Sequence, residues 1–131
     1  MRLNEISGSA SVSDMLHRFE GKQGVYFLIL ALPDCSSCEH MKSALAGFED
    51  DDFAFDSVVW SPPTNPEVIE ELASVLGITE FPSLLMLVDG KIFKRWSGFF
   101  ASDSAAERQA LLAQVLSQSL RQACADNGPA A

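Results

Sequence analysis

Residues 25–39 read VYFLILALPDCSSCE, and this stretch decides how the rest of the chain is interpreted. Val25–Leu32 is an unbroken apolar run rich in β-forming residues, which predicts a central strand covered on both faces. Pro33 cannot donate to a sheet ladder and ends the strand. Cys35 and Cys38 follow, where the apolar spacing becomes helical. A C-x-x-C at a strand-to-helix junction is typical of a redox-active dithiol.

The length and composition predict one globular domain. The chain has 131 residues, of which 47% are hydrophobic, and a chain of this size buries a core without disulfide staples. We expect a single domain over residues 1–131, with flexible ends at 1–10 and 125–131. The formal net charge of −9 argues against a nucleic acid or an anionic membrane surface as partner, because both attract clustered Lys and Arg.

No stretch of the sequence is typical of membrane insertion or export. The longest apolar run, Val25–Leu32, is too short to span a bilayer. Residues 1–9 lack the long apolar segment of a signal peptide. We therefore expect a cytoplasmic protein, and in that reducing compartment cysteines seldom form structural disulfides.

Helical spacing of apolar residues predicts two helices in the first half of the chain. One covers residues 12–19, is capped by Ser11 or Ser13, and ends at Gly21. The other begins at Cys35, directly after the central strand. The cysteine pair therefore lies in the first turn of a helix.

Two more helices are predicted further on. The third begins at Asn65-Pro66, with Asn as the N-cap and Pro at the first helical position, and it ends at Gly77. The last is capped by Ser102 or Asp103. Its buried stripe is expected to comprise Leu112, Val115, Leu116, Leu120 and Ala123. Ser119 interrupts that stripe, which predicts looser packing there.

The strands complete the predicted fold. Besides Val25–Leu32, strands are predicted at 53–60, 83–88 and 91–96. Residues 2–6 form either a short edge strand or a disordered segment. Asp89-Gly90, between the last two runs, predicts a type I′ hairpin turn. The order of elements predicts an α/β fold, a mixed β-sheet flanked by helices on both faces.

With its elements in this order, the chain resembles the thioredoxin family over roughly residues 10–122. The resemblance is carried by the apolar strand that leads into C-x-x-C and by four further segments: Asn65-Pro66, Gly77-Ile78, Phe81-Pro82-Ser83, and Asp89-Gly90 with Gly98 after it. Phe81-Pro82 resembles the family's cis-proline. The resemblance implies a thioredoxin-like mixed sheet and the activity of a thiol-disulfide oxidoreductase.

The residues around the cysteines depart from the family's pattern. Asp34 stands where the family usually has Trp, Glu39 where it has a basic residue, and Ile29 where it has a buried acid. Ser36-Ser37 replaces the family's Gly-Pro, and Ser83 replaces the Thr after the cis-proline. The sequence therefore resembles a divergent family member with an acidic C-S-S-C site.

The resemblance implies catalytic roles for Cys35 and Cys38. We expect Cys35 to be the thiolate, because the N–H groups and dipole of a helix N-terminus favour an anion. It would attack a substrate disulfide, and Cys38 would resolve the mixed disulfide. Phe81 and Pro82 are expected to bind an extended substrate through the backbone beside the proline. Trp60 is expected either to replace the missing Trp as a substrate platform or to be a core residue.

Metal binding is the other common use of C-x-x-C, but structural zinc needs four ligands. The remaining candidates, His17, His40 and Cys124, lie at no matching spacing. We therefore expect no metal, and no nucleotide or flavin cofactor. Cys124 is expected to be a half-buried helix residue or a free thiol.

Two functions fit these features. The first is a thiol-disulfide oxidoreductase in cell redox homeostasis, with a protein disulfide or dithiol substrate and a thiol or reductase electron donor as partners. The second is a thioredoxin-fold chaperone or assembly-factor binding module with little redox turnover, which the departures at Asp34, Ile29 and Glu39 favour. Turnover of a disulfide substrate distinguishes the two.

Overall fold

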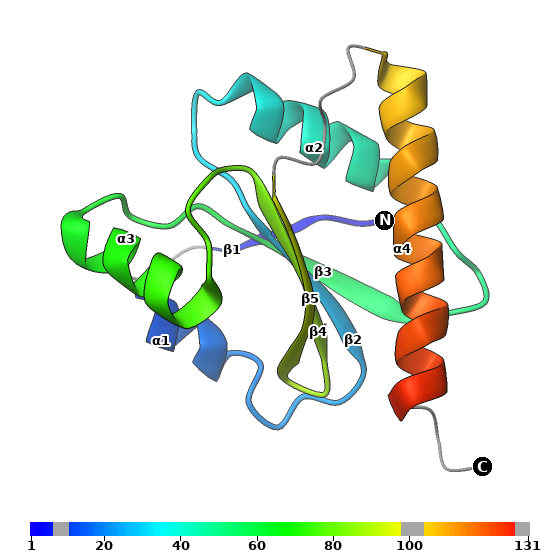
Figure 1. Cartoon of the computed structure of the whole chain (residues 1–131), viewed down its shortest axis with the longest axis horizontal. Helices are drawn as coiled ribbons and strands as arrows, with labels where there is room; N and C mark the ends of the chain where they lie inside the picture. Colours follow the sequence, from blue (N-terminus) through cyan, green and yellow to red (C-terminus); the bar gives the residue numbers. More distant parts are fainter. Residues whose placement is uncertain (7–10, 98–103, 128–131) are drawn as a thin grey trace.

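The computed structural model describes residues 1–6, 11–97 and 104–127, and these form a five-stranded mixed sheet between two layers of helices (Figure 1). The elements in chain order are β1 (Asn4–Ile6), α1 (Val12–His17), β2 (Val25–Leu30), α2 (Ser36–Ala46), β3 (Phe55–Trp60), α3 (Pro66–Glu71), the π-helical turn η1 (Leu72–Leu76), β4 (Ser83–Val88), β5 (Lys91–Ser97) and α4 (Ala105–Asn127).

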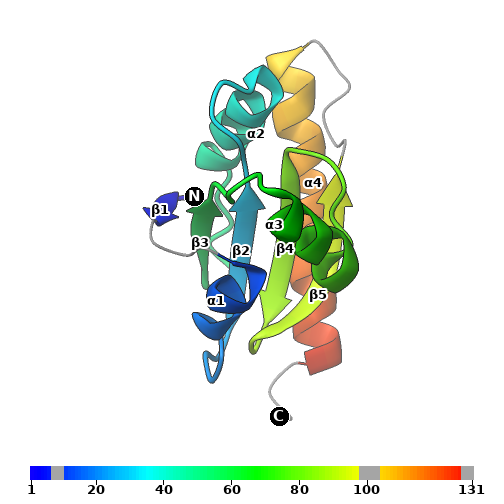
Figure 2. The same ribbon diagram turned by 90° about the vertical axis from the view of Figure 1, so that its left-hand side faces the viewer.

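The strand order across the sheet is β1-β3-β2-β4-β5 (Figure 2). The central strand β2 runs parallel to β3 and antiparallel to β4. Of the two alternatives for residues 2–6, the structure has the edge strand, and its pairing with β3 is parallel, from Asn4↔Val58 to Ile6↔Trp60. The predicted mixed sheet is therefore confirmed.

Both faces of the sheet are covered. Figure 1 shows α1 and α3 on one side of the sheet, and α2 and α4 on the other. Along β2, Phe27 and Ile29 point into the core beneath α2 and α4, whereas Leu28 and Leu30 point into the core beneath α1 and α3. All four side chains are fully buried, which explains why the sequence of β2 is continuously apolar.

The predicted helix caps and turn recur in the structure. Ser11 caps α1, because its Oγ accepts the Asp14 N–H at 3.1 Å. Asn65 caps α3, because its Oδ1 accepts the Val68 N–H at 3.0 Å. The hairpin turn is of type I′, since both central residues have positive φ: 52° at Asp89 and 82° at Gly90.

The third helix differs from its prediction. Its second half is the π-helical turn η1, because the N–H of Gly77 reaches back five residues to the Leu72 carbonyl. The N–H of Ile78 donates to the same carbonyl at 2.9 Å. Apolar spacing is too coarse to separate a single π turn from an α-helix. The left-handed Gly77 at the end of this helix is confirmed, with φ of 69°.

The last helix also differs in detail. The predicted caps Ser102 and Asp103 lie outside the described residues, as does Gly98. Ser104 instead accepts the Glu107 N–H at 3.3 Å. Ser119, expected to loosen the packing, is buried, and its hydroxyl donates to the Val115 carbonyl at 2.8 Å. Among the described residues, none of the helices combines the length and apolar character that a membrane span requires.

Candidate active site

The two cysteines lie where β2 leads into α2. Cys35 is the N-cap of α2, and Cys38 is in its first turn. The two sulfurs form a disulfide bond, and the Cα atoms are 5.2 Å apart. Asp34, just before Cys35, has a φ of 55°, a left-handed conformation that Asp and Asn adopt more readily than most residues. This turn redirects the chain from the sheet into the helix.

The two sulfurs have different surroundings. Cys35 is half-buried, whereas Cys38 is fully buried in the core beneath α2 and α4. The Cys38 N–H donates to the Cys35 Sγ at 3.2 Å, and the Ser37 Oγ lies 3.5 Å from the same sulfur. The Leu32 N–H donates to the Cys38 Sγ at 3.5 Å. An incoming disulfide can therefore approach Cys35 more readily than Cys38.

The loop before β4 lies at the same end of the sheet as the cysteines. Leu30, the last residue of β2, pairs with Ser83, the first residue of β4. The peptide bond between Phe81 and Pro82 is cis. Phe81 and Cys35 both pack against the same core cluster. The structure thus brings the predicted catalytic residues and two of the predicted substrate-binding residues to the same end of the sheet.

Ser83 fixes the conformation of this loop. Its side chain is buried, and its hydroxyl donates to the Glu80 carbonyl at 2.7 Å. The sequence contained no signal for this hydrogen bond, nor for the Leu32 N–H that meets Cys38, because backbone partners carry no side-chain signature.

Trp60 is a core residue, not a surface platform. Only 1% of its surface is exposed, and it packs in the cluster beneath α1 and α3. Trp60 ends β3, which pairs with both β1 and β2, and its side chain contacts the cluster formed by residues of α1, α3 and η1. Of the two expectations for Trp60, the core residue is the one that the structure shows.

The charged side chains near the dithiol are mostly acidic. Asp34 and Glu39 are exposed. Lys42, one turn further along α2, lies 3.2 Å from Glu5 and 3.3 Å from Glu39. Its hydrogen bond to Glu5 raises the pKa of the Lys42 ammonium, and Glu39 adds to this effect. Glu39 is therefore partly neutralised, whereas Asp34 has no ion pair among the described residues.

No described cluster suits a metal. Within the described ranges, no group of three or more His, Cys, Asp or Glu side chains is placed to hold a metal ion. His17 lies 3.0 Å from Glu20 on the exposed side of α1. Cys124 is an exposed free thiol on α4.

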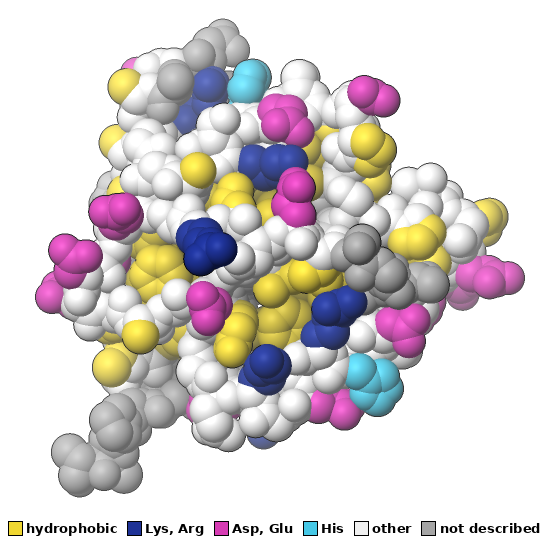
Figure 3. Space-filling view, turned by 180° about the vertical axis from the view of Figure 1, so that it is seen from behind, with side chains coloured by type: hydrophobic (Ala, Val, Ile, Leu, Met, Phe, Trp, Pro, Cys, Tyr) yellow, Lys and Arg dark blue, Asp and Glu magenta, His cyan; other side chains and the backbone are white. Residues whose placement is uncertain are grey.

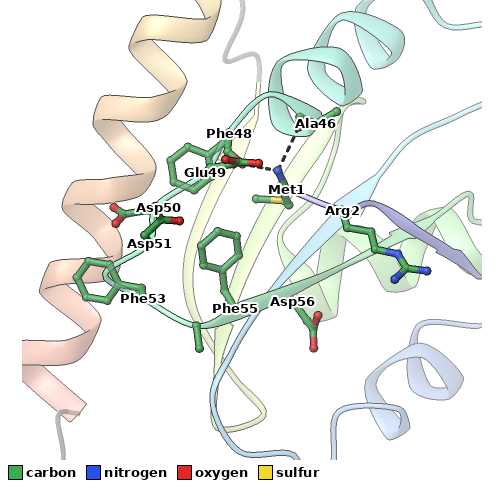
Figure 4. A pocket seen from close by; sticks show the side chains of 11 residues that line it. Met1, Arg2, Ala46, Phe48, Glu49, Asp50, Asp51, Phe53, Phe55 and Asp56 are labelled. Carbon is green, nitrogen blue, oxygen red and sulfur yellow. Dashed lines mark hydrogen bonds between the residues drawn. The ribbon is translucent and has the colours of Figure 1, made fainter.

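Figure 4 shows a hollow of about 640 Å³, and neither Cys35 nor Cys38 is part of its lining. It opens between Met1, the end of α2 and the start of β3, and its lining includes Phe53 and Asp56. The Met1 amine donates to the Ala46 carbonyl at 3.1 Å and also to the Phe48 carbonyl. Seen from behind, the molecule shows several hydrophobic patches between charged side chains (Figure 3). The described lining of the hollow includes no cysteine, so it is not a site for thiol-disulfide chemistry.

Comparison with known proteins supports the same fold. No protein-family model and no curated protein matches the chain. Among solved structures, the reduced desulfothioredoxin of Desulfovibrio vulgaris Hildenborough is 27% identical, with 86% of this chain and 96% of that chain covered and a TM-score of 0.54. The oxidised thioredoxin of Plasmodium falciparum is 13% identical, with coverages of 91% and 99% and a TM-score of 0.58. A mutant thioredoxin of Halobacterium salinarum NRC-1 is 16% identical, with 91% of each chain covered and a TM-score of 0.55.

Proposed function

The chain is a thioredoxin-like protein with a C-S-S-C pair, and we propose that it is a thiol-disulfide oxidoreductase acting on protein disulfides. The observation that carries the proposal is the place of Cys35. Its sulfur caps α2 and accepts the Cys38 N–H at 3.2 Å. Unpaired N–H groups and the helix dipole favour a negative charge at this position, which is what a nucleophilic thiolate needs.

The proposed exchange begins with the Cys35 thiolate. It attacks one sulfur of the substrate disulfide, a new S–S bond forms as the substrate's own bond breaks, and the released thiolate takes up a proton. Cys38, after losing its proton, attacks the Cys35 sulfur and releases the second substrate thiol. The substrate gains two electrons and two protons, and the protein is left with the Cys35–Cys38 disulfide. A cellular thiol or dithiol donor reduces that disulfide by the reverse steps.

The loop of Phe81 and Pro82 is the proposed substrate-binding surface. It lies beside the dithiol at the end of the sheet, because Leu30 and Ser83 are paired. An extended substrate segment can lie along this loop with its disulfide over Cys35. We also propose a cytoplasmic location, since a reducing compartment supplies the thiols that regenerate the dithiol.

Turnover of a protein disulfide tests the proposal. We expect the protein to accelerate the reduction of insulin by dithiothreitol, measured as precipitation of the reduced insulin chain. Cys35→Ser should abolish the acceleration. Cys124→Ser is the matched control, because this cysteine is exposed on α4 away from the pair, and it should leave the rate unchanged.

The alternative is a binding module with little redox turnover. It is favoured by the acidic residues Asp34 and Glu39 beside the pair and by the apolar Ile29, which leaves no buried acid beside Cys38. This alternative would be supported if the wild-type and Cys35→Ser proteins bound a partner with the same affinity and the wild type turned over no disulfide substrate.

A further inference from the structure

The hydroxyl of Ser37 is a hydrogen-bond donor to the Cys35 sulfur. The two atoms are 3.5 Å apart, which is within reach for a sulfur acceptor. A disulfide sulfur carries no proton, so the hydroxyl must be the donor in this pair. The bond is local, because Ser37 lies in the first turn of α2 and Cys35 caps the same turn.

We propose that Ser37 is a further catalytic residue, whose hydroxyl stabilises the Cys35 thiolate by donating a hydrogen bond to it. The proposal deepens the proposed oxidoreductase function and rests on it. On reduction the sulfur gains a full negative charge, and hydrogen bonds to a charged acceptor are roughly twice as strong as neutral ones. Together with the Cys38 N–H, the thiolate then has two directed donors from one helical turn.

Several charged groups also act on this thiolate. Asp34 and Glu39 flank the pair, and Glu80 precedes the proline loop; these acids oppose a second negative charge. His40 and Arg108 line one hollow between α2 and α4, and the Arg108 cation favours a negative charge in its vicinity. All five lie outside the Ser36-Ser37 dipeptide, so they are common to every variant compared below.

Ser36 is the natural control for Ser37. Both are exposed serines in the first turn of α2. Of these two serines, only Ser37 has a described hydrogen bond to a cysteine sulfur. Replacing either serine by Ala removes one hydroxyl and slightly favours the helix. A difference between the two variants therefore isolates the hydroxyl that meets Cys35.

The hydrogen bond has a second consequence for the redox equilibrium. A donor that favours the thiolate also favours the reduced protein over its disulfide, because the thiolate is the stronger acceptor. Ser37 should therefore make the Cys35–Cys38 disulfide easier to reduce. Loss of the hydroxyl shifts the equilibrium with glutathione towards the oxidised protein.

The test is the pH dependence of Cys35 alkylation by iodoacetamide in the reduced Cys124→Ser protein, which removes the other exposed thiol. At a pH below the thiol pKa, Ser37→Ala should lower the thiolate fraction and the alkylation rate by about five- to tenfold. The same variant should shift the glutathione equilibrium towards the disulfide. Ser36→Ala should change neither quantity, and Ser37→Thr, which keeps a hydroxyl, should restore most of both.

Alkylation profiles of Ser37→Ala and Ser36→Ala that superimpose would overturn the inference. Alkylation requires no substrate turnover, so this result is separate from a failure of the proposed function. If insulin reduction fails while Ser37→Ala still raises the thiol pKa, the oxidoreductase proposal is wrong and the role of Ser37 in stabilising the thiolate stands.

Discussion

Ile29 and Cys38 are both fully buried in the hydrophobic cluster beneath α2 and α4. The fully buried polar residues among the described ones are three serines: Ser57, Ser83 and Ser119. No described buried acid is therefore placed to accept the proton that Cys38 loses before it attacks. That proton has to pass to water or to an exposed group.

Introducing an acid at Ile29 tests how apolar this site is. Ile29→Asp should destabilise the fold more than the matched Ile29→Asn, because burial raises the pKa of the new carboxyl and penalises its charged form. The unfolded acid ionises near pH 4, so the extra cost should be small at pH 4 and grow as the pH rises to 7. Urea unfolding at the two pH values measures it. If the difference in stability between the two variants does not change with pH, position 29 is not the buried apolar site described here.

Trp60 should matter for stability and not for exchange. Trp60→Phe removes part of a side chain that is 1% exposed, and the remaining cavity should lower the free energy of unfolding by about 1–3 kcal/mol. Where the variant is folded, its rate of insulin reduction should equal that of the wild type. A folded Trp60→Phe protein with a much slower rate of insulin reduction would show that Trp60 takes part in substrate binding.

Asp34 should slow the attack by Cys35 and favour cationic substrates. Asp34→Asn removes the charge while keeping a residue type that tolerates the φ of 55°. The variant should react faster with the neutral 2-hydroxyethyl disulfide. Its preference for cationic cystamine over that neutral disulfide should fall by about two- to fivefold at low salt. The reaction of each disulfide with dithiothreitol corrects for intrinsic reactivity. An unchanged preference would show that Asp34 does not act on the substrate.

Gly77 and Gly21 form a matched pair for backbone strain. Both have positive φ, but a Cβ at Gly77 would clash with the Arg95 Nη1, whereas one at Gly21 meets nothing within 4 Å. Arg95 Nη1 donates to the Leu76 carbonyl at 2.7 Å. Gly21→Ala should cost about 1 kcal/mol from the left-handed backbone alone, and Gly77→Ala should cost more, because Arg95 must give up its bond. In an Arg95→Ala background, measured by urea unfolding, the two glycine substitutions should cost the same.

The order of elements could be predicted because several local signals agreed. The apolar run at Val25–Leu32, the Asn65-Pro66 helix start and the Asp89-Gly90 turn each have a direct physical cause. The structure has a strand over Val25–Leu30, two residues shorter than predicted, and has the helix start and the turn as predicted. The predicted place of Cys35 at the start of a helix followed from the change of spacing after Pro33, and the structure has Cys35 as the N-cap.

What the sequence did not predict depends on contacts between distant segments. The burial of Trp60 is set by β1 and by the helices above it, and a strand-ending Trp has the same local pattern whether it is covered or exposed. The π-helical turn at Leu72–Leu76 differs from an α-helix by a single hydrogen-bond step. The bonds of Leu32 and Ser83 involve backbone groups that every residue carries.

The most direct test of the central claim is a mixed disulfide trapped on Cys35. The reduced protein with Cys38→Ser and Cys124→Ser is mixed with 2-hydroxyethyl disulfide and analysed by mass spectrometry after proteolysis. We expect one mercaptoethanol adduct, on the peptide that contains Cys35, and no adduct in a protein that also carries Cys35→Ser. With both cysteines of the pair present, the adduct should be resolved to the Cys35–Cys38 disulfide. Two results would contradict the proposed exchange: a reduced, folded Cys38→Ser protein that forms no adduct on Cys35, or a protein with both cysteines in which the adduct is not resolved.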